Sequence, residues 1–223
     1  MTPLLTKLIE ITALPLKQVE QDFAVDSTGF STSQFKRWLD IRTKKISKKR
    51  KWKKVHALCG VKTNIITSIE ITEGTANDSP YLVPLVEVTN KYFEMREVSA
   101  DKAYSSKANL KAVSEIGALP FIPFKKNTTG RSRGSMIWKR MFLFFTQHQE
   151  EFLKHYHKRS NVETTFAMIK KKFSYKLHTK KEVSQINELL MKCLCHNLSV
   201  LVHESFELGI EINFRKCFDI IHN

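Results

Sequence analysis

The stretch KHYHKRSNVETTFAMIKKKF, residues 154–173, combines a helical pattern with a one-sided distribution of charge. It carries six Lys or Arg residues and a single carboxylate, Glu163. At about 100° per residue, one narrow stripe of this helix is apolar; it contains Val162, Phe166, Ile169 and Phe173. A second stripe, about 80° away, is polar; it contains Tyr156, Arg159, Glu163 and Lys170. Glu163 therefore flanks the buried face, either as the helical ion-pair partner of Arg159 or as part of a site.

The overall charge indicates a polyanionic partner. The chain has 223 residues, of which 42% are hydrophobic, and a net charge of +15. It can bury one sizeable core, and its charge favours nucleic acid or an anionic membrane surface. The membrane is disfavoured because no apolar run approaches about 18 residues. The four cysteines fit a buried, reduced role better than a disulfide framework or a zinc site, which predicts a cytoplasmic protein.

The order of expected elements predicts an α/β fold. Strands are expected at 22–30, with a turn at Gly29, and at 51–61, 64–72, 96–101 and 119–124. Helices are expected at 77–93 and 106–118, and then from about 136 to 172 and from about 181 to 207. The second and third strands are separated by Lys62 and Thr63 alone, which predicts an antiparallel hairpin. The later strands alternate with helices and are expected to continue the sheet in parallel.

Two acids stand at or near strand ends. Asp26 follows Phe23, Ala24 and Val25, and an unpaired buried carboxylate is costly there. A turn or cap residue is the simpler interpretation, because Ser27, Thr28 and Gly29 follow. Asp101 closes the apolar run 98–100, where it is either a cap or a ligand-binding residue at the carboxyl end of a strand.

Three segments together resemble the catalytic segments of insertion-sequence DDE transposases. They are AVDSTGFS around Asp26, VSADKAYSS around Asp101 and the stretch around Glu163. The third matches that family's Tyr-x2-Arg-x3-Glu-x6-Lys signature at Tyr156, Arg159, Glu163 and Lys170. The resemblance covers roughly residues 22–203.

This resemblance implies an RNase H-like fold, with a mixed five-stranded sheet flanked by helices and a helical C-terminus. The first and fourth strands would carry Asp26 and Asp101, and a later helix Glu163. These three carboxylates would converge and bind two Mg²⁺ ions, with Mn²⁺ able to substitute, as suits hard oxygen ligands and phosphoryl transfer. Water would cleave the phosphodiester at the element end, and the freed 3′-hydroxyl would attack target DNA.

Basic residues are expected to contact DNA. The resemblance implies phosphate contacts from Tyr156, Arg159 and Lys170, although Arg159 could instead pair only with Glu163. The densest charge run, RTKKISKKRKWKK at 42–54, is interpreted equally well as a DNA contact or as a solvated flap. The further candidates for DNA contact are Lys102, Lys48, Lys49, Arg50, Lys51, Lys53 and Lys54.

Only 25 residues precede Asp26, where family members usually carry a helical DNA-end-binding region. We expect residues 1–21 to be a remnant of that region, residues 22–207 the catalytic domain and residues 208–223 a C-terminal tail. The predicted function is a DNA transposase that acts as a homodimer on double-stranded DNA of element ends and target, in the cytoplasm and associated with the nucleoid. The alternatives are a truncated DNA-binding remnant that inhibits a full-length transposase, or an RNase H-like nuclease.

Overall fold

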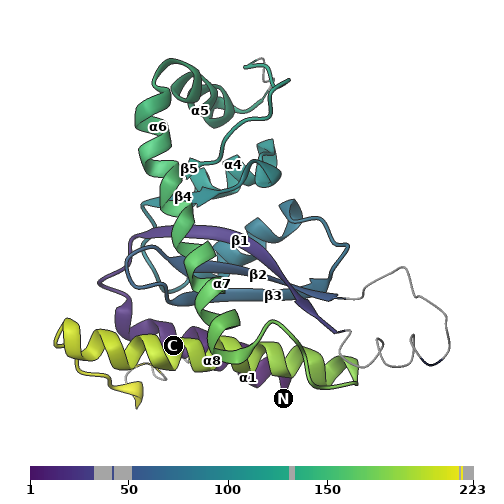
Figure 1. Ribbon diagram of the computed structural model, residues 1–223. Coiled ribbons are helices and arrows are strands. Elements are labelled where there is room, and N and C mark those ends of the chain that lie inside the picture. Colours follow the sequence, from purple (N-terminus) through teal and green to yellow (C-terminus); the bar gives the residue numbers. More distant parts are fainter. Residues whose placement is uncertain (33–41, 43–51, 131–133, 216, 218–223) are drawn as a thin grey trace.

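The computed structural model describes residues 1–32, 42, 52–130, 134–215 and 217. Its centre is a five-stranded sheet with the order β3-β2-β1-β4-β5 (Figure 1). The strands are β1 (Asp22–Ser31), β2 (Trp52–Gly60), β3 (Ile66–Glu73), β4 (Glu97–Ala100) and β5 (Leu119–Phe121). β2 runs antiparallel to both β1 and β3, whereas β4 runs parallel to β1 and β5. The predicted mixed α/β sheet of RNase H-like type is therefore confirmed.

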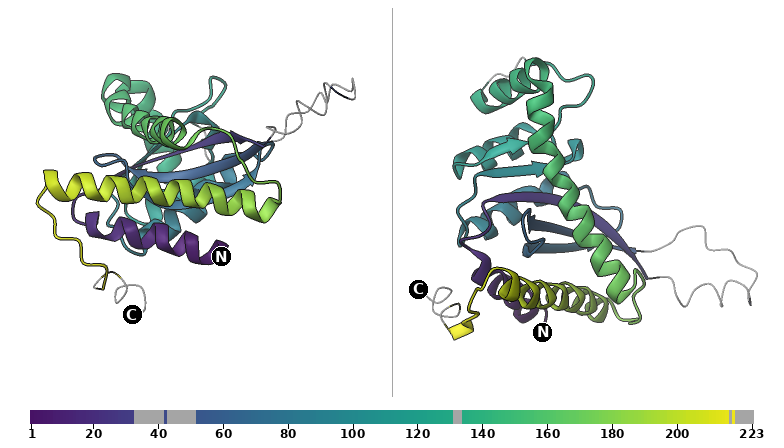
Figure 2. Two further views of the ribbon diagram at one scale, coloured as in Figure 1. Left: turned by 60° about the horizontal axis from the view of Figure 1, so that its bottom comes forward. Right: turned by 60° about the vertical axis from the view of Figure 1, so that its left-hand side comes forward.

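Helices cover both faces of the sheet (Figures 1 and 2). The first face packs against α1 (Thr2–Ala13), α7 (Ser160–Phe173) and α8 (Glu182–Glu207), and the second against α3 (Leu82–Asn90) and α4 (Lys107–Glu115). Two further helices, α5 (Met136–Gln147) and α6 (Gln149–Tyr156), lead from the β5 side of the sheet into α7. None of the helices in the described part of the chain is long and apolar enough to cross a membrane.

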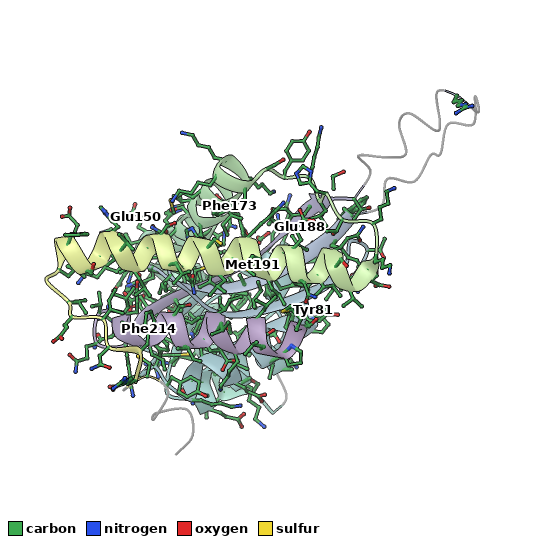
Figure 3. All side chains as sticks on the ribbon, turned by 90° about the horizontal axis from the view of Figure 1, so that it is seen from below. Tyr81, Glu150, Phe173, Glu188, Met191 and Phe214 are labelled. Atoms are coloured by element: carbon green, nitrogen blue, oxygen red, sulfur yellow. The ribbon has the colours of Figure 1, made fainter. Side chains whose placement is uncertain are left out.

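The first helix is packed into the same unit as the sheet. α1 and α8 lie side by side below the sheet, and Figure 3 shows both from that side, with Met191 on the outer surface of α8. Leu5 and Ile9 of α1 are buried with the sheet residues. Asn197 of α8 donates to the carbonyl of Ile9 and accepts from the N–H of Ile66 at 3.0 Å. The interpretation of residues 1–21 as a remnant of a DNA-end-binding region stays a prediction.

The strand that was expected to turn at Gly29 continues to Ser31. Gly29 pairs with Lys54 of β2, so the ladder extends past the polar residues that suggested a turn. Asp26 consequently lies in the middle of β1 rather than at a strand end. The turn interpretation of Asp26 was wrong because pairing with a long neighbouring strand outweighs the local preference of Ser, Thr and Gly for turns.

The helical region at 136–173 is broken in two places. α5 and α6 are separated at His148, and the 3-10 helix η5 (His157–Arg159) separates α6 from α7. α7 therefore begins only at Ser160, and Glu163 lies in its first turn. The break places Tyr156 and Glu163 on different elements, although the sequence pattern assigned them to one helical stripe.

Candidate active site

Asp26 and Asp101 lie at neighbouring positions on two parallel strands. Val25 of β1 and Ala100 of β4 are partners in the parallel register, and each is followed directly by its aspartate. β4 ends there because Asp101 caps the 3-10 helix η4 (Lys102–Tyr104), with its carboxylate accepting the first backbone N–H at 2.5 Å. The predicted cap role of Asp101 is thus present. The same geometry places the two aspartates side by side at the end of the segment in which β1 and β4 pair.

Glu163 lies near this end of the paired strands, on α7. The apolar stripe of α7 is buried on β1 and β2, with Val162 and Ile169 fully buried and Phe166 5% exposed. Glu163 follows Val162 directly and therefore lies at the border of the buried face, with its side chain 55% exposed. It is more exposed than its expected place on a continuous helix implied.

Arg159 joins two of the three acids. Its Nη1 donates to Asp26 Oδ2 at 2.6 Å, and its Nη2 donates to Glu163 Oε1 at 2.5 Å. The side chains of Arg159 and Asp26 are 19% and 20% exposed, so this half of the bridge is largely shielded from solvent, whereas the Glu163 half is exposed. The predicted pair with Glu163 is therefore present. The contact with Asp26 is an addition that the spacing within the helix could not reveal.

Burial perturbs the carboxyl group of Asp26. Its pKa is raised, chiefly because the carboxyl is buried. A hydrogen bond from the Ser27 N–H and the charge of Arg159 oppose this rise, whereas the negative charges of Asp101 and Glu163 add to it. The negative charges of the three acids therefore act on one another, although burial is the larger cause of the shift at Asp26.

The donor set fits a hard divalent cation, since three carboxylates offer oxygen ligands. As the side chains stand in the described residues, however, no group of three or more His, Cys, Asp or Glu is arranged to hold a metal ion. Arg159 lies between Asp26 and Glu163 in that arrangement. Metal binding by Asp26, Asp101 and Glu163 stays a prediction.

The other two signature residues lie at different points along the chain leading through α7. The ring of Tyr156 lies 5.8 Å from the Arg159 guanidinium carbon, so the two stack at the entry to α7. Lys170 lies further along α7, donates to Thr28 Oγ1 at 2.5 Å and sits over the Phe30 ring. Burial lowers the pKa of Lys170. Arg159 and Lys170 thus contact β1 at Asp26 and, nearer to its end, at Thr28.

The remaining basic candidates have different surroundings. Lys102 is exposed directly after Asp101. Lys53 is buried and forms ion pairs with Glu73 and Glu182, and Lys54 binds Asp78 at 2.9 Å. Four of the candidates lie outside the described residues; they are Lys48, Lys49, Arg50 and Lys51.

Sequence reasoning missed a polar network that holds the segment before α7. Lys158 donates to Asp22 at 2.8 Å and to Glu97 at 2.7 Å, and His155 contacts the same Glu97 carboxylate. Glu97 is buried in β4 although it is charged. The sequence signal for this network was Glu97, a charged residue at the start of a short strand. Its position in the sequence does not indicate which side chains it contacts.

Most of the sequence is similar to a known protein family. Residues 17–198 match a family model described as the transposase DDE domain. The chain belongs to this family. No curated protein matches the sequence.

Membership of the transposase DDE family fixes the general character of the chain. It is a DDE transposase domain of a family of DNA-cutting and DNA-joining enzymes, and the family implies DNA as a partner. Members of the family generally use divalent metal ions. The matched region contains all three predicted acids, together with β1, which carries Asp26, and β4, which Asp101 follows.

Proposed function

We propose that this chain is the catalytic part of an insertion-sequence transposase that hydrolyses a phosphodiester at the element end and transfers the freed 3′-hydroxyl to target DNA. The observation that carries the proposal is the register of β1 with β4, which brings Asp26 and Asp101 together. Glu163, held to Asp26 through Arg159, supplies the third acid. Two acids at the sheet and a third on the basic helix beside it suit chemistry on a DNA phosphate.

Asp26, Asp101 and Glu163 would hold two Mg²⁺ ions, or Mn²⁺ in their place. When bound, such ions stabilise the charge that develops on the attacking and leaving oxygens of a phosphodiester. The protein's part is to hold the carboxylates at fixed places. The paired strands position Asp26, the cap geometry positions Asp101, and the buried stripe of α7 positions Glu163.

Tyr156, Arg159, Lys170 and Lys102 are the proposed DNA contacts among the described residues. Arg159 offers a planar fork to a phosphate, Lys170 and Lys102 a point charge and Tyr156 a hydroxyl. Lys53 and Lys54 are left out of the proposed surface because their ammonium groups are already paired with carboxylates of the protein. Contacts from Lys48, Lys49, Arg50 and Lys51 stay predictions from the sequence.

A strand-transfer assay with pre-cleaved ends of the element and Mg²⁺ tests the proposal. Transfer products that disappear in Asp101→Asn support it, since this change removes a ligand charge at constant volume. Glu115→Gln is the matched control, because Glu115 is exposed on α4, and it should leave the products unchanged. Nicked fragments without transfer would identify a nuclease instead. Retention of DNA without any product would identify a binding remnant.

We further propose that the active complex is a homodimer acting on two DNA ends in the cytoplasm, associated with the nucleoid. The net charge of +15 favours assembly on DNA and disfavours contact between bare copies. Light scattering with and without end DNA tests this proposal. A complex that contains one protein copy per pair of ends would contradict it.

A further inference from the structure

The guanidinium of Arg159 occupies the carboxylates that the proposed function assigns to metal ions. Its two terminal nitrogens lie 2.6 Å from Asp26 Oδ2 and 2.5 Å from Glu163 Oε1. These acids come from β1 and α7, which are far apart in the sequence, and Arg159 contacts both of them. Both contacts are short, charge-assisted hydrogen bonds, which are among the stronger ones in proteins.

A cation and Arg159 would compete for the same oxygen atoms. Asp26 Oδ1 already accepts the Ser27 N–H, and Oδ2 accepts Arg159, so both oxygens of this carboxylate are engaged. A metal ion that uses Oδ2 must displace the guanidinium or bear its repulsion at close range. In the free protein, therefore, the arginine lowers the affinity of the site for a divalent ion.

DNA offers Arg159 an alternative partner. The guanidinium lies at the end of η5, at the entry to α7, and stacks beside the Tyr156 ring. Arg159 can exchange two carboxylate oxygens for two oxygens of a phosphate, which matches the same fork geometry. When it does so, Asp26 and Glu163 lose their counter-charge and become free to accept a metal ion.

We infer that Arg159 couples DNA binding to metal binding by closing the acid site in the free protein and opening it when a DNA phosphate takes over the guanidinium. This inference rests on the proposed function, because it assumes that the three acids bind metal. The coupling must be reciprocal, so that bound metal also tightens DNA binding. A protein built in this way keeps its metal site weakly loaded until DNA is present.

The test is the affinity for Mn²⁺, measured from free Mn²⁺ by electron paramagnetic resonance with and without a short mixed-sequence duplex. For the native chain, DNA should tighten Mn²⁺ binding on the order of tenfold, a typical size for coupling between two sites. Arg159→Met should bind Mn²⁺ more tightly than the native chain without DNA, by a similar factor, and should gain nothing further from DNA. Mn²⁺ bound by the DNA itself is subtracted with a Glu163→Gln, Asp26→Asn double variant.

Two further variants separate the specific effect of the Arg159 bridge on Mn²⁺ binding from a general effect of positive charge. Lys171→Met removes one positive charge from an exposed position of α7 and should behave as the native chain does. Arg159→Lys keeps the charge but has a single ammonium that cannot bridge both acids, so it should fall between the native chain and Arg159→Met. It also serves if Arg159→Met fails to fold, which circular dichroism would show.

The outcomes distinguish this inference from the proposed function. If the native chain binds Mn²⁺ as tightly as the Arg159 variants and DNA changes nothing, the coupling is refuted while the transfer assay can still support the transposase. If neither the native chain nor any Arg159 variant binds Mn²⁺ above the double variant, the metal site is absent. In that case both the inference and the proposed metal mechanism fail together.

Discussion

Lys158 donates a 2.7 Å hydrogen bond to Glu97, a carboxylate that lies buried at the start of β4. The same ammonium reaches Asp22 of β1, so one lysine ties two neighbouring strands to the segment that leads into α7. Arg159 is the next residue in the chain. The ion pairs of Lys158 therefore hold the backbone of the neighbouring Arg159 in place. Its position determines which carboxylates the guanidinium can reach.

Lys158→Met should destabilise the protein by roughly 1–3 kcal/mol, because it leaves the buried Glu97 carboxylate short of its counter-charge. The expected loss is below that of a fully buried pair, since the Lys158 side chain is 29% exposed. Urea denaturation measures it. Lys154→Met removes the same charge from an exposed position of α6 and should change the free energy of unfolding little. Equal losses in both variants would show that the Glu97 contact contributes nothing specific.

The pH dependence of stability should contain a contribution from His56. Burial, as the main cause, lowers the pKa of this imidazole from 6.5 to about 4, although the charge of Asp78 opposes the shift. The unfolded chain then binds a proton that the folded chain does not, so stability falls as the pH drops from about 6.5 towards 4. The full loss is on the order of 3 kcal/mol.

Comparison of the native chain with His56→Gln isolates this contribution. Glutamine can keep the hydrogen bond to Thr72, which the imidazole makes at 2.9 Å, but it does not titrate. The difference in free energy of unfolding between the two proteins should shrink or reverse as the pH falls through this range. A difference that stays constant from neutral pH to pH 4 would mean that His56 is protonated in the fold as readily as in the unfolded chain.

The residue pattern located the two strand acids, whereas their convergence was expected from the family resemblance and not from any local pattern. Strands were predicted at 22–30 and 96–101, and the structure has β1 and β4 there, with Asp26 inside β1 and Asp101 directly after β4. The parallel register that pairs Val25 with Ala100 depends on how the intervening helices and strands pack in the fold. The turn expected at Gly29 did not form for a related reason. Gly29 pairs with β2, and the local sequence around Gly29 does not show that this pairing is available.

Arg159 and Lys53 show the same limit for charges. The spacing of four residues identified the pair of Arg159 with Glu163, but its other partner, Asp26, is 133 residues away. Lys53 belongs to a dense basic run and was predicted to contact DNA, yet the fold pairs it with Glu73 and Glu182. Charge density along a chain predicts a polyanionic partner for the whole protein, whereas the partner of each side chain is set by tertiary contacts.

Gly60→Ala should destabilise the turn between β2 and β3 by roughly 1–3 kcal/mol, because it disrupts hydrogen bonds of a buried carboxylate. A Cβ at Gly60 would overlap the side chain of Glu20. That carboxylate accepts the N–H and the hydroxyl of Thr63 at 2.6 and 2.7 Å, and it cannot move without losing both. Thermal denaturation measures the effect.

A double-mutant cycle checks the cause of that loss. Once Glu20→Ala has removed the carboxylate, the added methyl at Gly60 has room, and Gly60→Ala should cost far less than it does in the native chain. If the two changes are additive, the loss comes from the backbone of Gly60 and not from its contact with Glu20.

Lys170→Met should weaken binding to double-stranded DNA about equally for all sequences and reduce the slope of log affinity against log salt by about one unit, as expected for one lost phosphate contact. The Lys170 ammonium donates to Thr28 Oγ1 in the free protein, on the side of the sheet where β1 carries Asp26. Its lowered pKa, caused by burial, indicates a cation with few compensating charges, which a phosphate would supply. Lys172→Met is the matched control, since Lys172 is exposed two residues further along α7. Fluorescence anisotropy over a salt series measures both slopes, and equal slopes for the two variants would place Lys170 outside the DNA contact.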